Sequence, residues 1–187
     1  MTSRVAISNE ALLLCGAALI ISPSDTSSQA IAVNAVYNDT RDEVLRAFDW
    51  DSARRSAALG SALTDTPPMR WAYAFTLPTD PYCLIVREAN NNVDFEVQGR
   101  TLLCNESSLV IRYTARIPEA QMDPTLGTAI AMRIASKVCY TLTKDKIRTR
   151  ELYQAYKHVL ADGGHIDSLQ GTPVHPFTNT LDSVRDA

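Results

Sequence analysis

The chain begins with two segments whose apolar residues recur at helical spacing. Ile7, Ala11, Leu14 and Cys15 fall at positions i, i+4, i+7 and i+8, which predicts a helix over residues 3–15. Gly16 stands where a helix commonly ends in a left-handed residue. After a polar connector, a second helix is predicted over about residues 27–48. Its apolar stripe comprises Ala30, Val33, Tyr37, Val44, Leu45 and Phe48.

Between residues 51 and 117 the period changes from helical to alternating. Trp71, Tyr73, Phe75 and Leu77 alternate with small or polar residues, as expected for a strand buried on one face. Further short apolar segments follow, separated by turn-forming sequences such as the three asparagines at 90–92. Short strands joined by tight turns predict a small antiparallel β meander.

From residue 118 onward the helical spacing returns. Asp123 suits the N-cap of a third helix and Pro124 its first position. The apolar stripe of this helix comprises Leu126, Ile130, Ile134, Val138 and Leu142. A fourth helix is predicted from about 144 to 161, and the glycine pair at 163–164 is expected to end or bend it.

These elements place the chain in the α+β class. Two N-terminal and two C-terminal helices are expected to form a four-helix bundle-like domain from residues 1–50 and 118–170. The antiparallel β domain, residues 51–117, is inserted between the two helical pairs. Residues 171–187 contain two prolines and no apolar periodicity, so we expect an extended C-terminal tail that orders against a partner.

The composition supports a globular chain and disfavours a surface that wraps nucleic acid. With 187 residues, 45% of them hydrophobic, the chain can bury a sizeable core. Its 18 Lys and Arg against 21 Asp and Glu give a net charge of −3, whereas proteins that grip phosphates are usually basic. The apolar run at 11–21 is shorter than the roughly 20 residues of a membrane span, so no membrane partner is expected.

The cysteines and histidines give little support to a metal site or a disulfide framework. Cysteines stand far apart and are expected to be buried, reduced thiols; they are Cys15, Cys83, Cys104 and Cys139. His158, Asp162 and His165 could be imagined as metal ligands, but the glycine pair interrupts the helix that would align them. Nucleophile-elbow, phosphate-loop, zinc-protease and dinucleotide motifs are all absent from the sequence. We therefore predict no catalytic, metal or cofactor-binding residues, and no cofactor.

Basic side chains are the most plausible contacts with a partner or with a channel lumen. Arg112 and Arg116 share one face of a predicted strand, and the densest run of positive charge is the sequence TKDKIRTR at 143–150. The candidate contacts are Arg54, Arg55, Arg112, Arg116, Lys144, Lys146, Arg148 and Arg150. In the tail, the candidates for binding a neighbour or another protein are Pro173, His175, Pro176, Phe177 and Leu181.

Several sequence blocks, in a fixed order, point to a particular protein family. They include ALLLCG, RDEVLRAFDW, YAFTLPTD, FEVQGRTLLCNESSLVIRYTARI and DPTLGTAIAMRIASKVCYTLT. Together these blocks, over about residues 5–170, resemble the tail tubular protein A family, the head-to-tail adaptors of T7-like short-tailed bacteriophages.

The resemblance implies a structural role in the virion tail for a protein made in the host cytoplasm. Members of that family form a dodecameric ring between the portal and the tail nozzle, and double-stranded DNA passes through the lumen without sequence-specific binding. The partners it implies are thus other copies of the chain, the portal protein and the nozzle protein, with tail fibres as further candidates. It also implies that the protein is not an enzyme.

Two other functions remain open on the sequence alone. A tail-associated wall-degrading hydrolase would need a carboxylate with a raised pKa in a cleft, and Glu88, Glu96 and Glu106 are its candidates in the β region. A small helical binding or regulatory module would need no such group.

Overall fold

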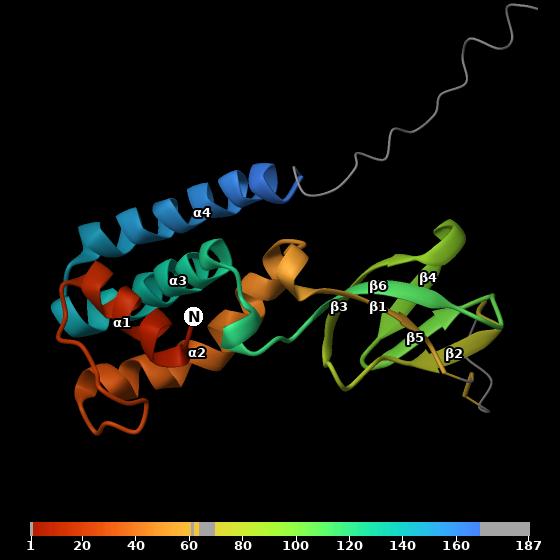
Figure 1. Ribbon diagram of the computed structural model, residues 1–187, viewed down its shortest axis with the longest axis horizontal. Helices are drawn as coiled ribbons and strands as arrows, with labels where there is room; N and C mark the ends of the chain where they lie inside the picture. Colours follow the sequence, from red (N-terminus) through yellow and green to blue (C-terminus); the bar gives the residue numbers. More distant parts are fainter. Residues whose placement is uncertain (1, 61, 64–69, 169–187) are drawn as a thin grey trace, which may run out of the picture.

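The helices and the strands occupy opposite ends of the molecule (Figure 1). The computed structural model describes residues 2–60, 62–63 and 70–168. This part of the chain contains four α-helices and two three-stranded antiparallel sheets, which confirms the predicted α+β class. The predicted tail contacts at 173–181 lie outside the described residues.

The first three helices begin and end where the sequence predicts. They are α1 (Arg4–Cys15), α2 (Ser28–Ala47) and α3 (Pro124–Thr143). Ser3, Ser27 and Asp123 cap their N-termini, each side chain accepting a hydrogen bond from the backbone N–H three residues later. Gly16 ends α1 with φ of 72°, a conformation that glycine adopts without steric cost.

The fourth helix, α4 (Lys146–Ser168), is longer than predicted. It continues through the glycine pair at 163–164, so the expectation that these residues end the helix is wrong. A glycine within a helix costs only about 1 kcal/mol relative to alanine, and unlike proline it keeps its backbone hydrogen bond. Two adjacent glycines therefore weaken a helix without terminating it.

The six strands form two sheets whose strand order differs from that of a simple meander. Sheet order is β1-β6-β3 in one and β2-β5-β4 in the other. The bounds are β1 Arg54–Ala58, β2 Tyr73–Thr76, β3 Cys83–Ala89, β4 Phe95–Gln98, β5 Thr101–Cys104 and β6 Val110–Ala115. The last strand, β6, lies in the centre of its sheet, and its Ile111, Tyr113 and Ala115 are all buried. A strand of that composition is most stable with a partner on each side.

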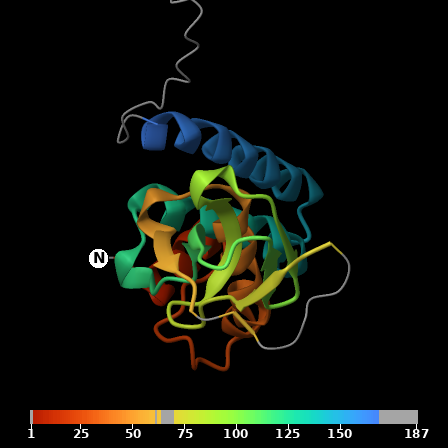
Figure 2. The same cartoon turned by 90° about the vertical axis from the view of Figure 1, so that its right-hand side faces the viewer.

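One hydrophobic core extends from the helices into the sheets. α3 packs against α1, α2 and α4. One cluster of buried residues includes residues of the helices and of the strands, together with Trp50, Ala53 and Ile117 from the segments that join them. Trp50 is 1% exposed, and its indole N–H donates to the Val44 carbonyl at 3.0 Å. Seen from the strand end, the sheets lie in front of the bundle and α4 crosses one side (Figure 2). All four cysteines are buried and unpaired, as predicted.

Candidate functional site

Four of the predicted basic contacts lie where the helices meet the first sheet. Arg54 and Arg112 both bind the side chain of Asp49, which follows α2, with distances of 3.2 and 2.9 Å from guanidinium nitrogen to carboxylate oxygen. Arg54 also forms an ion pair with Asp51, and Arg112 forms one with Glu88. Hydrogen bonding to Glu88 raises the pKa of the Arg112 guanidinium. These groups form a cluster that we call the junction, defined by Asp49, Arg54, Arg87 and Arg112.

The other two arginines of this group, Arg55 and Arg116, also bind groups of the protein close to where the helices meet the first sheet. Arg55 donates to the Ser52 carbonyl at 2.9 Å and to the Gln121 side chain at 3.1 Å. Arg116 pairs with Asp42 on α2. The prediction placed Arg112 and Arg116 on one strand face, and in the structure both side chains reach carboxylates near or just after the end of α2.

Arg87, which is not among the predicted contacts, has more partners than any other arginine of the junction. Its guanidinium donates to the Arg46 and Phe48 carbonyls at 3.0 and 2.7 Å, and to the hydroxyl of the fully buried Thr114 at 2.9 Å. Burial lowers the pKa of Arg87, and the nearby Asp49 carboxylate acts in the opposite direction. An arginine within an apolar strand, as in LIVREA, is the sequence signal that could have identified it.

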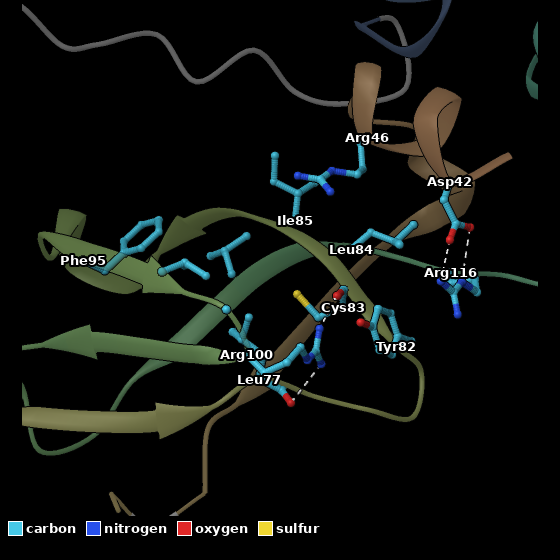
Figure 3. A pocket seen from close by; sticks show the side chains of 13 residues that line it. Asp42, Arg46, Leu77, Tyr82, Cys83, Leu84, Ile85, Phe95, Arg100 and Arg116 are labelled. Carbon is cyan, nitrogen blue, oxygen red and sulfur yellow. Dashed lines mark hydrogen bonds and ion pairs between the residues drawn. The ribbon is translucent and has the colours of Figure 1, made fainter. Parts of the chain in front are cut away.

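A groove of about 610 Å³ opens beside the junction, between the end of α2 and strands β3 and β4 (Figure 3). Its lining combines apolar side chains, among them Leu77, Leu84, Ile85 and Phe95, with the polar groups described next. We call it the β3–β4 groove.

The polar residues that line the β3–β4 groove include arginines that bind other groups of the protein. Arg100 and Arg116 both stack on Tyr82, with guanidinium carbons 4.1 and 4.6 Å from the ring centroid. Arg100 also donates to the carbonyls of Leu77, Pro78 and Cys83, and so ties the β2–β3 turn to β5. With Arg116 held by Asp42, these two cations are organised by the fold itself.

The other four predicted cations lie at the far end of the bundle, where α3 gives way to α4. Lys144 adopts a left-handed conformation and ends α3, and Lys144 and Lys146 both lie over the ring of Tyr140. Arg148 donates to the Leu14 carbonyl of α1 at 3.0 Å, whereas Arg150 is exposed. The structure thus brings this run together with the end of α1.

The same end of the molecule collects exposed apolar side chains. It is formed by the end of α1, the connector at 16–27, the start of α2, the end of α3 and the start of α4 (Figure 1). We call it the bundle end. Of the ten large hydrophobic side chains exposed among the described residues, six lie on these segments: Leu13, Leu19, Ile21, Ile31, Tyr140 and Ile147. Ile21 is 92% exposed and Ile147 74%. An apolar concentration of this kind commonly marks a protein-binding surface.

The candidate carboxylates of the hydrolase alternative occupy unpromising environments. Glu88 is the exposed partner of Arg112, and Glu106 lies on an exposed turn. Glu96 accepts hydrogen bonds from Gln98 and the Trp71 indole, and these hold its pKa below the ordinary value. A general acid for glycoside hydrolysis needs the opposite shift.

Among the side chains that the structure describes, no three of His, Cys, Asp or Glu are grouped so that they could hold a metal ion. The side chains of Asp162 and His165 lie outside the described part. Within it, no helix combines the length and apolar character that crossing a membrane requires. Comparison of the sequence with models of known families and with curated proteins finds no match to either.

Proposed function

We propose that the protein is a structural component of a bacteriophage tail, a head-to-tail adaptor that forms a ring between the portal and the tail nozzle. The observation that carries this proposal is the bundle end, where exposed apolar side chains and a run of basic residues meet at the pole opposite the sheets. A protein with two chemically different poles suits a part that joins two others. The sequence resemblance supplies the identity of those partners, the dodecameric ring and the virion location.

The energetics of the bundle end support a partner that covers it. Burying a fully exposed isoleucine or leucine side chain contributes about 1.5–3 kcal/mol. Because Ile147 is 74% exposed, covering it alone accounts for roughly 1–2 kcal/mol of binding free energy. When the same contact is repeated around a ring, the linked subunits bind the partner with a higher overall affinity than one subunit would. The exposed apolar side chains call for an apolar partner surface, and the cations at 144–150 favour acidic residues on that same surface.

The state of the junction arginines agrees with a conduit through which DNA slides. Arg54, Arg87 and Arg112 are directed to carboxylates and carbonyls of the protein itself. The chain as a whole is acidic, with a net charge of −3. Because these arginines are paired within the protein, they are not available to phosphates, and DNA that passes the junction would release few counterions and bind there only weakly.

The test is to mix the purified protein with the portal ring encoded by the same genome and to examine the mixture by electron microscopy. We expect a ring of added density on one face of the portal, with a symmetry that gives the copy number. Ile147→Asp should abolish the added ring, whereas the control Val110→Asp, at an exposed valine of β6, should not. An intact portal that gains no density would refute the adaptor proposal. Equal binding by both variants would refute the role of the bundle end.

A further inference from the structure

Two of the four buried cysteines meet where α1 packs against α3. Cys15 is the last residue of α1, and Cys139 lies one turn before the end of α3. The Cys15 thiol donates to the Ala135 carbonyl, with Sγ 3.6 Å from the oxygen. In an α-helix that same carbonyl accepts the N–H of the residue four positions later, which here is Cys139. The thiol of Cys15 and the backbone of Cys139 therefore share one acceptor.

Small residues line the face of α3 on which Cys139 lies. They follow one another at steps of four and so share one side of the helix: Gly127, Ala131, Ala135 and Cys139. At one end of this row, a Cβ atom added to Gly127 would lie only 3.2 Å from the side chain of Thr2, just before α1. Small side chains let two helix backbones approach closely. A disulfide requires such an approach, with Cα atoms about 4.4–6.8 Å apart.

The electrostatics of Cys15 agree with contact between the two thiols. Burial raises the pKa of the Cys15 thiol to about 12, and the charge of Cys139 and a hydrogen bond with its side chain act in the same direction. Both of the latter effects require the two side chains to be neighbours. The other two cysteines belong to different sheets, Cys83 to β3 and Cys104 to β5.

Cys15 is the member of the pair that lies nearer to solvent. It is 6% exposed, whereas Cys139 is 0% exposed. The next residue, Gly16, is already exposed at the bundle end. Arg148 of α4 donates to the neighbouring Leu14 carbonyl, and its positive charge favours the thiolate form of Cys15. Transient opening of the last turn of α1 therefore exposes Cys15 first, beside a cation that supports the reactive form of its sulfur.

We propose that Cys15 and Cys139 are the site of an intramolecular disulfide, which forms when the folded protein meets a small disulfide such as hydroxyethyl disulfide. The Cys15 thiol loses its proton, and its sulfur attacks one sulfur of the oxidant, whose S–S bond breaks and releases one thiol. The Cys139 thiol then loses its proton, and its sulfur attacks Cys15 Sγ and releases the second thiol. Two protein thiols are oxidised, one small disulfide is reduced to two thiols, and those products take up the two protons.

The link would join α1 to α3 and close a loop of about 120 residues. A reducing cytoplasm keeps such a pair as thiols, so the linked form belongs to an oxidising medium. This proposal does not depend on the proposed function, since it requires neither a portal nor a ring.

Peptide mapping of the oxidised full-length protein tests the proposal directly. The native protein is incubated with hydroxyethyl disulfide at pH 8 until a denatured sample treated in the same way has lost all of its free thiols. The remaining thiols of the native sample are then alkylated in denaturant, and the peptides are identified by mass spectrometry. We expect one linked pair, Cys15 with Cys139, while Cys83 and Cys104 stay as thiols.

Thermal melts of the same samples test the effect of the link. Oxidation should raise the Tm of the wild type by at least about 5 °C, because the link constrains the unfolded chain, and a reductant should reverse the rise. The rise should be absent in Cys139→Ala and kept in the control Cys104→Ala, which removes a thiol that is equally buried. Each variant is compared with its own reduced form, so the cost of the substitution itself does not enter the comparison.

Four results would overturn the proposal. The first is a native sample without the Cys15–Cys139 link, including one in which Cys15 carries only an adduct of the oxidant. The second is a link that joins two copies of the chain, seen as a dimer on a non-reducing gel. The third is a linked protein whose Tm is not raised, which would show that the bond distorts the bundle. The fourth is an equal rise in Cys139→Ala.

Discussion

The guanidinium of Arg87 should hold the sheets to the helices, and its removal should be costly. In Arg87→Ala the carbonyls of Arg46 and Phe48 and the hydroxyl of Thr114 all lose their donor. A hydrogen bond that involves a charged group contributes about 1.5–3 kcal/mol, and leaving a buried polar group unpaired costs about 1–3 kcal/mol. Allowing for non-additivity and for the 20% exposure of the side chain, we expect a loss of about 3–5 kcal/mol in the free energy of unfolding.

Arg112→Ala is the matched control, because it removes an arginine from the same cluster. Arg112 is 31% exposed, and one of its partners, Glu88, is 63% exposed. Exposed ion pairs contribute about 0.2–1 kcal/mol, so the control should lose only about 1 kcal/mol. Urea denaturation followed by circular dichroism measures both losses. If the two variants differ by less than about 0.5 kcal/mol, the reasoning from burial and partner number is wrong.

Three further predictions concern the core, a thiol and a carboxylate. Leu126→Ala, at a fully buried position of α3, should lower the free energy of unfolding by about 2–5 kcal/mol, whereas Ile147→Ala should change it by less than about 0.5 kcal/mol; equal losses in urea titrations would contradict the packing described here. Burial raises the pKa of the Cys15 thiol to about 12, so at pH 8 iodoacetamide should label Cys15 only after denaturation; rapid labelling of the native protein, read by mass spectrometry, would contradict this. Burial alone would raise the pKa of Glu43, but hydrogen bonds from Lys137 and Arg133 hold it below its ordinary value. The stabilisation is complete above the unfolded pKa and is lost as the pH falls through the lower folded pKa. The stability gap between wild type and Glu43→Gln should therefore narrow as the pH falls below the ordinary range of a glutamate carboxyl; a constant gap in pH-dependent thermal melts would refute it.

The helices were predictable because their signals are local. Ser3, Ser27 and Asp123 cap helices through hydrogen bonds that span three residues, so composition and spacing determine where each helix begins. The end of α4 was not predictable in the same way. The penalty at the glycine pair is small, and a helix of this length can absorb it.

The pairing of strands and the use of the arginines required long-range information. Alternation identified β6 as a strand but could not show that it lies between β1 and β3, because that order depends on which apolar faces meet. Arg54 and Arg112 were predicted as outward contacts, yet both reach Asp49 at the end of α2. The β3–β4 groove was missed for the same reason, since it exists only once β3 and β4 lie at the two edges.

The register of β1 with β6 has a mechanical consequence. The chain crosses between the helices and the sheets twice, before β1 and after β6, and Arg54 and Thr114 at these two crossings are direct partners in the ladder. Tension along the long axis of the molecule therefore pulls both strands in the same direction and does not slide one past the other. The ladder between them is spared shear, and the load is shared by two backbone segments and by the Arg87 hydrogen bonds to the end of α2.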